Sequence, residues 1–255
     1  MSVTWRDHPG GPQKRGPSWQ EMVNEAARKL GFSDPILARV RGTDLQILEY
    51  FKLKNEGFHP LTNWLYAEMR PPDEALRRSA IHEKLAQLVK CKLIYTTNYD
   101  DFIERSLMLN GRQSKRVAVE SDMVKSMAGD VCEVVKFHGD FNFPQHMVLS
   151  EFDYEQRLTL ETVMDYRFRS DMLGRMVLFL GYSFRDPNVS YLFTRMNVNF
   201  KKLPGAPSGR RAYITVADPS DFEIELFRAR NIEVIPISSG DQTGQIAELL
   251  EAMKG

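Results

Sequence analysis

The chain has 255 residues, of which 42% are hydrophobic and 27% charged, and its 34 basic side chains balance 34 acidic ones. This composition is typical of a globular protein with one large or two small domains, long enough to bury a full core. A net charge of zero provides no overall attraction for nucleic acid or anionic lipid. We therefore expect neither a dedicated nucleic-acid-binding protein nor a membrane-surface protein.

Cysteine and histidine usage argues against a metal centre. The two cysteines, Cys91 and Cys132, each lie in or beside an apolar run, and the five histidines are spread over separate segments. Neither a disulfide framework nor a cysteine-based zinc ribbon can be built from them. No stretch approaches the roughly 18 apolar residues of a membrane span, and no signal-peptide core is present. We expect a cytoplasmic protein without a metal.

The first third of the chain has the pattern of helices. Residues 1–16 are rich in glycine, proline and charge and predict a loop or tail. Ser18, with Glu21 three residues later, is typical of a helix start. Helical patterning continues from there and includes an insertion at about residues 44–89. Its large apolar side chains form either a core or a contact surface between copies in a homo-oligomer, and a core is commoner. They are Phe51, Phe58, Trp64 and Leu65.

Beyond residue 90 the pattern changes to short apolar runs separated by amphipathic helices. Such runs are typical of parallel strands that are covered on both faces. We therefore expect an α/β fold with an open, doubly wound, mostly parallel sheet of the Rossmann-like kind. The predicted strands are residues 93–96, 132–137, 176–180, 212–216 and 233–237.

Three of these strands are followed by unusual polar sequences. Ligands of open α/β sheets bind beyond the carboxyl ends of the strands, and parallel neighbours would bring these sequences to one rim. We therefore expect the functional site there. The three sequences are Thr96-Thr97-Asn98-Tyr99-Asp100, His138-Gly139-Asp140 and Gly181-Tyr182-Ser183.

Each polar residue in these sequences has a structural as well as a functional interpretation. His138 can exchange a proton near neutrality, yet an isolated histidine more often caps a strand end. Asn98 can donate and accept a hydrogen bond at once. Asp100 can bind ribose hydroxyls or cap the following helix, and for an isolated residue the cap is the more frequent role. Gly181 and Ser183 would let the backbone pass beneath a flat ring or a phosphate.

Taken together, the three sequences resemble the sirtuin superfamily, and within it the zinc-free bacterial sirtuin-like domains of antiviral defence. Residues 96–100 are similar to the family's Thr-Gln-Asn-Ile-Asp element, with Thr97 in place of glutamine. Residues 137–139 match its catalytic His-Gly, and residues 181–188 match its Gly-x-Ser nucleotide loop. The combination is more specific than any one motif.

The chain departs from the family's pattern in two places. Residues 140–180 contain no cysteine, whereas the deacetylases carry a four-cysteine zinc module there. Residues 1–16 contain no counterpart of the family's first strand and Gly-Ala-Gly turn, whose amides hold a pyrophosphate. The resemblance covers about residues 16–250, so we expect a sirtuin-like NAD-binding domain over residues 17–255.

The resemblance implies an NAD glycohydrolase that cleaves the nicotinamide–ribose bond and depletes NAD in antiviral defence. It assigns catalysis to Asn98, which positions the ribose or water, to His138, which accepts a proton, and to Asp100, which orients the nicotinamide side of the pocket. It implies NAD as substrate, no metal, and a separate sensor or activator protein as partner. The residues implied to bind NAD are Thr96, Thr97, Gly181, Tyr182 and Ser183.

Two other functions stay open at this point. A catalytically silent nucleotide-binding or assembly module would account for the absent glycine turn. A protein deacylase or ADP-ribosyltransferase would use the same strand ends, although the absence of cysteines from residues 140–180 disfavours deacylation. Release of nicotinamide from NAD separates the hydrolase from the silent module.

Overall fold

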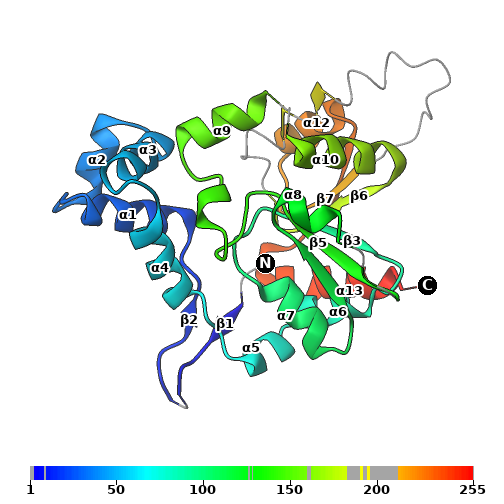
Figure 1. The fold of residues 1–255 in the computed structure, drawn as a ribbon. Helices are drawn as coiled ribbons and strands as arrows, with labels where there is room; N and C mark the ends of the chain where they lie inside the picture. The colour runs from blue at the N-terminus through cyan, green and yellow to red at the C-terminus, as the bar shows by residue number, and fades with distance from the viewer. Residues whose placement is uncertain are drawn as a thin grey trace. The chain divides into compact units, whose positions relative to one another are not determined.

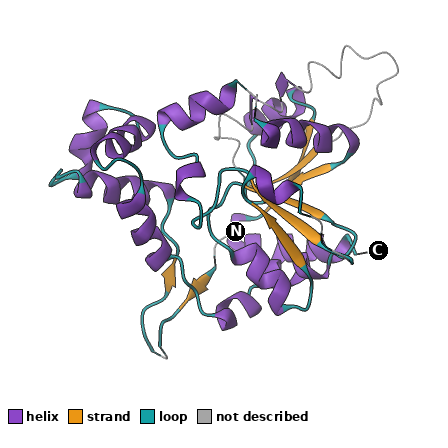
Figure 2. Ribbon diagram, viewed as in Figure 1, coloured by secondary structure: helices purple, strands orange, loops and turns teal. Residues whose placement is uncertain are grey.

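The chain divides into two compact units, an N-terminal unit over Ser2–Glu155 and a C-terminal unit over Gln156–Met253 (Figure 1). Each unit contains a three-stranded parallel sheet. Figure 2 colours the helices and strands by type. The α/β class with parallel strands is therefore confirmed. The single domain 17–255 stays a prediction. The computed structural model describes residues 3–8, 10–125, 127, 129–159, 162–182, 190–191, 194–195 and 212–254.

From Trp19 to Gln87 the N-terminal unit is helical, as the sequence predicts. The Ser18 hydroxyl accepts a hydrogen bond from the Glu21 amide, and the Glu21 carboxylate accepts one from the Ser18 amide, so the expected capping box is formed. The helices are α1 (Trp19–Lys29), α2 (Pro35–Arg41), α3 (Asp44–Lys54), α4 (His59–Glu68), α5 (Asp73–Arg77) and α6 (Ala80–Gln87).

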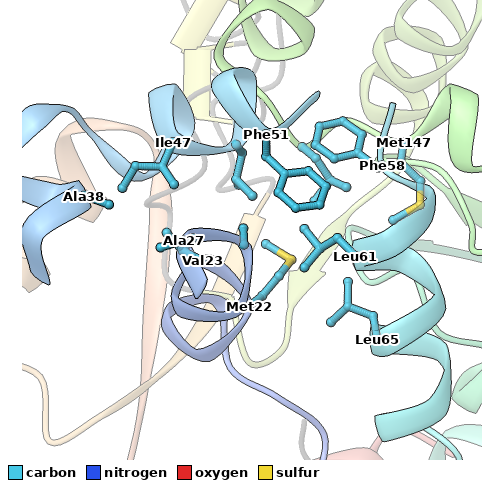
Figure 3. Packing of buried hydrophobic residues seen from close by; sticks show 13 residues of the cluster. Met22, Val23, Ala27, Ala38, Ile47, Phe51, Phe58, Leu61, Leu65 and Met147 are labelled. Carbon is cyan, nitrogen blue, oxygen red and sulfur yellow. The ribbon is translucent and has the colours of Figure 1, made fainter. Parts of the chain in front are cut away.

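Helices α1 to α4 enclose a hydrophobic core of their own (Figure 3). The rings of Phe51 and Phe58 stack nearly parallel, with 6.4 Å between their centroids. Leu65 is buried in the same cluster, and Trp64 packs against it half-buried. The core interpretation of these four side chains is therefore confirmed. Met147, from the segment after the second predicted strand, belongs to the cluster and joins the helices to that segment.

The sheet of the N-terminal unit has the order β3-β5-β4, with all strands parallel. Strand β3 (Leu93–Thr96) leads into α7 (Phe102–Leu109), which contacts β4 (Ser114–Val117). Helix α8 (Glu120–Met123) follows β4, and β5 (Cys132–Lys136) completes the sheet at its centre. The predicted strands 93–96 and 132–137 are thus confirmed within one residue.

Strand β4 was not predicted, because its sequence Ser-Lys-Arg-Val contains no apolar run. It lies at an edge of the sheet, where one side of a strand meets no neighbour and charged residues are common. Lys115 lies opposite Glu133 of β5, and its ammonium group donates to that carboxylate at 2.9 Å. Cross-strand charge pairing therefore adds to the burial of Val117, the one fully buried apolar side chain of this strand.

The segment 1–16, expected to be loop or tail, contains a short antiparallel ladder. Strands β1 (Thr4–Trp5) and β2 (Lys14–Arg15) pair, with Thr4 opposite Arg15. The sequence did not indicate this ladder, which is buried on the β1 side while Lys14 and Arg15 of β2 are exposed. Val3 is buried against Leu76 and Phe102, and Trp5 is buried as well.

The C-terminal unit has a parallel sheet of order β6 (Val177–Phe179), β7 (Ala212–Ala217) and β8 (Ile232–Ile237). These strands match the predicted apolar runs, and helices α12 (Asp221–Ala229) and α13 (Gln242–Ala252) contact β8. This unit also contains α10 (Val163–Gly174) and η2 (Ser239–Asp241). The segment between β5 and α10 forms η1 (Pro144–His146) and α9 (Glu151–Leu158). Among the described helices, none is long and apolar enough to span a membrane.

Candidate active site

The carboxyl ends of the parallel strands β3 and β5 lie side by side at the same end of the sheet. Thr96 lies opposite Lys136 in the parallel register, and the Phe137 amide donates to the Thr96 carbonyl at 2.8 Å. Asn98 and His138 each follow this pair by two residues. The polar sequences after the two strands are therefore neighbours, as expected from parallel pairing.

His138 is buried in the N-terminal unit, with 2% of its surface exposed. Its ring packs edge-on against Tyr154, at 5.6 Å between centroids, and at a tilt against Phe137 at 5.7 Å. Its backbone carbonyl accepts a hydrogen bond from the Val148 amide at 2.9 Å. Both ring contacts would be lost in His138→Ala, so this imidazole also contributes to packing.

Gly139 follows His138 with a backbone φ of +91°, in the region that favours glycine. A Cβ atom at this position would lie 2.7 Å from the His146 carbonyl oxygen and 2.8 Å from the Met147 Cα. Both are backbone atoms that a rotamer change cannot move away. Gly139 therefore allows the chain after β5 to lie close against the backbone of His146 and Met147.

Asp100 is buried at the start of α7. It is 6% exposed, and its Oδ1 accepts a hydrogen bond from the Phe102 amide at 3.1 Å, which fixes the start of α7. Burial raises the pKa of its carboxyl, and the positive charge of Lys136 opposes this rise. This contact with the first amide of α7 is observed, although the N-cap position itself is Asp101, whose side chain makes no cap hydrogen bond. A role toward nicotinamide stays a prediction.

The residues around Asn98 present polar atoms at the surface. The Asn98 side chain is exposed, and its backbone amide donates to the Thr96 hydroxyl at 3.1 Å. Thr96 and Thr97 are half-buried. Because the Asn98 side chain is exposed, it contributes little to packing and can contact a ligand.

The third predicted sequence belongs to the C-terminal unit. Gly181 has a φ of +61°, and the ring of Tyr182 stacks on Phe179 with 5.6 Å between centroids. Ser183 lies outside the described residues. The NAD-binding role assigned to these residues stays a prediction.

A pocket of about 410 Å³ opens in the N-terminal unit beside the two strand exits. Its volume lies within the ordinary range of small-molecule pockets. Asn98 and His138 are not among the described residues that line it, whereas Asp100 is. The lining comprises Tyr66, Met69, Arg70 and Pro71 from the end of α4, Tyr99, Asp100, Asp101 and Arg105 from the first exit and α7, and Asp140, Phe141 and Asn142 from the second exit.

Aromatic rings form much of the pocket wall. Phe141 meets Tyr66 edge-on at 6.2 Å and lies 6.1 Å from the ring of Tyr99. The Tyr99 hydroxyl donates to the Val148 carbonyl at 2.8 Å, which holds its ring in place. The Arg70 guanidinium lies 4.9 Å over the Tyr66 ring. The wall thus offers flat apolar faces beside carboxylate and guanidinium groups, a combination that suits a planar polar ligand.

A buried charge cluster, which the sequence did not predict, lies between the two exits. The Lys136 side chain is fully buried, and its ammonium group donates to the Asp100 carbonyl. Asp140 is buried and accepts hydrogen bonds from Arg116 and from the Asn142 amide. One feature of the sequence could have indicated this cluster: Lys136 lies between Val135 and Phe137 in an apolar strand. Because an unpaired lysine is rarely buried, a lysine at this position predicts compensating groups around it.

The expectation of no metal also stays a prediction. Among the described residues, no group of three or more His, Cys, Asp or Glu side chains is arranged to hold a metal ion. Burial raises the pKa of the Cys132 thiol to about 11, so this sulfur is a protonated, weakly ligating group near neutrality.

Comparison with known proteins decides the family. The model of the SIR2-like domain matches residues 92–235, from the start of β3 into β8 and across both strand exits. The chain belongs to the SIR2-like family. The sirtuin resemblance drawn from the three polar sequences is thereby confirmed.

This SIR2-like chain is similar to several curated bacterial proteins. It is 25% identical over 186 residues to an NAD(+) hydrolase ThsA of Acinetobacter baumannii (strain 532279), covering 72% of this chain and 37% of that protein. It is 30% identical over 185 residues to an NAD(+) hydrolase ThsA of Enterococcus faecium, covering 69% and 36%. It is 24% identical over 148 residues to Defense-associated sirtuin 2 of Bacillus subtilis, covering 57% and 14%. The chain therefore spans little more than a third of the two hydrolases.

Proposed function

We propose that this SIR2-like chain hydrolyses NAD at the edge of the sheet where β3 and β5 end. The observation that supports this most strongly is the pocket of about 410 Å³ beside these exits, lined by the buried Asp100. Two relatives of the chain are named NAD(+) hydrolases, which supports the same substrate. The proposed products are nicotinamide and ADP-ribose.

The chemistry required at such a site is the exchange of nicotinamide for water at C1′ of the ribose. The C1′–N bond breaks, its electron pair passes to the pyridine nitrogen, and the ribose gains oxocarbenium character, as in glycoside hydrolysis. A water molecule then forms the new C1′–O bond and gives up a proton. The enzyme accelerates this by placing polar groups where charge develops and by orienting the water.

The roles that we propose for these residues rest on the family resemblance. Asn98, exposed at the end of β3, holds the ribose or the attacking water through its amide. His138, at the end of β5, accepts the proton from a hydroxyl or from the water. Asp100 lines the pocket and orients the carboxamide of nicotinamide. The ring of nicotinamide packs against Tyr66 and Phe141.

The rest of the dinucleotide is assigned on the family resemblance. Thr96 and Thr97 contribute polar groups near the ribose, and Gly181, Tyr182 and Ser183 bind the adenosine half. A neutral chain needs no basic groove for this ligand, because backbone amides and helix N-termini can carry its phosphates.

The biological role that we propose is depletion of NAD in antiviral defence. Support comes from the relative named Defense-associated sirtuin 2 and from the two relatives named NAD(+) hydrolases. The chain would act in the bacterial cytoplasm and respond to a separate sensor or activator protein. Association between copies of the chain is part of this proposal.

Product analysis tests the reaction class. Purified protein is incubated with NAD, with and without an acetyl-lysine peptide, and the products are separated by chromatography. Hydrolysis predicts nicotinamide and ADP-ribose in equal amounts without the peptide. Nicotinamide release that requires the peptide would indicate a deacylase instead. Calorimetric binding of NAD without any nicotinamide release would indicate the silent module.

A further inference from the structure

Lys136 carries the most completely buried charge of the pocket region. It occupies the last position of β5, and no part of its side chain is exposed. Removing an ammonium group from water is strongly unfavourable unless its donors and its charge are compensated. The groups that compensate the Lys136 charge therefore identify the segments of the chain that this residue connects.

Those groups come from three parts of the N-terminal unit. The ammonium group donates to the Asp100 carbonyl, in the loop after β3. It lies 3.7 Å from an Asp140 carboxylate oxygen, in the loop after β5, and 3.6 Å from Glu104 Oε1, on α7. Both loops line the pocket. One cation thus connects the two loops and the helix that follows the first of them.

Asp140 extends these connections. Its Oδ1 accepts from the Asn142 amide at 2.9 Å and from the Asn142 side chain at 2.7 Å. The same oxygen accepts from Arg116 of β4 at 3.3 Å. The loop after β5 is therefore shaped around this carboxylate, while Lys136 joins its other oxygen to the backbone of Asp100.

We propose that Lys136 is a positioning residue that fixes the loop Thr97–Asp101 against the loop Asp140–Asn142. It touches no substrate in this account, because its ammonium group faces the protein interior. Its effect on catalysis rests on the proposed NAD hydrolysis, since Asn98 and Asp100 lie in the loop that it fixes. A displacement of about 1 Å at such a loop lowers turnover by about 100-fold.

A single Lys136→Met change is a poor test of positioning. It would leave the carboxylates of Glu104 and Asp140 buried without their cation, and loss of folding would follow from charge alone. The charge-balanced variant Lys136→Met with Glu104→Gln avoids this problem. It removes one positive and one negative charge and still deletes the hydrogen bond to the Asp100 carbonyl.

A matched control is available in the same sheet. Lys115 and Glu133 form a cross-strand pair at 2.9 Å between β4 and β5, three register positions before Lys136. The variant Lys115→Met with Glu133→Gln makes the same chemical change without touching either loop. Any general consequence of losing a lysine–glutamate pair appears in both variants.

The experiment compares hydrogen exchange of the amides of residues 97–101 and steady-state NAD cleavage in the full chain. The proposal predicts exchange at least about 10-fold faster in the Lys136 variant than in the Lys115 variant. It also predicts a kcat lower by at least about 10-fold, with KM changed by less than about threefold. Exchange within about twofold of the control would overturn it. If the unmodified chain cleaves no NAD, the proposed function fails, and the exchange rates alone then decide the role of Lys136.

Discussion

At the residue scale, the turn at Gly139 is the clearest consequence of steric constraint. Replacing Gly139 by alanine combines a positive φ with a Cβ that approaches two backbone atoms closer than 3 Å. We predict a loss of about 2–4 kcal/mol in the free energy of unfolding, measured by urea titration. Gly111→Ala is the control, because Gly111 also has a positive φ but open space around it. Equal losses for both variants would show that the close approach at Gly139 is unimportant.

His82 makes stability depend on pH. Burial lowers the pKa of its imidazole from 6.5 to about 4, so the folded chain holds the neutral ring. The unfolded chain binds a proton below pH 6.5. Stability is therefore fully present above that pH and falls by roughly 3 kcal/mol as the pH drops to about 4.

Urea titrations between pH 7 and pH 4 check this contribution. In His82→Gln the decline with falling pH should be shallower than in the unmodified chain, because the ionisable group is gone. His59→Gln, at an exposed position on α4, is the matched control. Identical slopes for the His82 variant and the unmodified chain would contradict the assignment.

Sequence alone predicted the two neighbouring strand exits but not the chemistry between them. Asn98, Asp100 and His138 follow apolar runs, so their place at the edge of the sheet follows from strand order. Lys136 lies inside such a run, and what compensates its charge depends on groups from α7 and two loops. Contacts of that kind are set by tertiary packing, which no local pattern encodes.

At the element scale, helix α3 shows how the helical cluster is held. Leu48 is fully buried in the core of α1 to α4, whereas Leu53 on the same helix is 69% exposed. Leu48→Ala should lower the free energy of unfolding by about 3 kcal/mol, from lost burial and the cavity that remains. Leu53→Ala should change it by less than about 0.5 kcal/mol. Similar effects in thermal or urea unfolding would contradict the observed orientation of α3.

The three strands that were not predicted, β1, β2 and β4, share one cause. The predicted strands β3, β5, β6, β7 and β8 are apolar runs, and periodicity finds such strands well. Strand β4 is held by backbone pairing and the charges of Lys115, and the ladder of β1 and β2 by burial of Val3 and Trp5. In both cases the stabilising contact lies on a distant segment, so the local sequence gave no strand signal.

At the scale of the whole molecule, the proposed cleavage of NAD requires no metal. Nicotinamide departs as a neutral molecule, so its release needs no electrophilic ion to hold a developing negative charge. We predict that a chelator such as EDTA leaves NAD cleavage unchanged and that elemental analysis finds no stoichiometric zinc. Loss of activity with EDTA and its return with added zinc would contradict this prediction.

The most direct test of NAD hydrolysis at the β3 and β5 exits is nicotinamide release by Asn98→Ala. Asn98 is exposed, so this change should leave folding intact while removing the group that holds the ribose or water. Asn63→Ala, at an exposed position on α4, is the matched control. The account predicts at least a roughly 100-fold loss of turnover for Asn98→Ala and a change of less than about twofold for Asn63→Ala. Full nicotinamide release by Asn98→Ala would place the chemistry elsewhere in the chain and contradict the account.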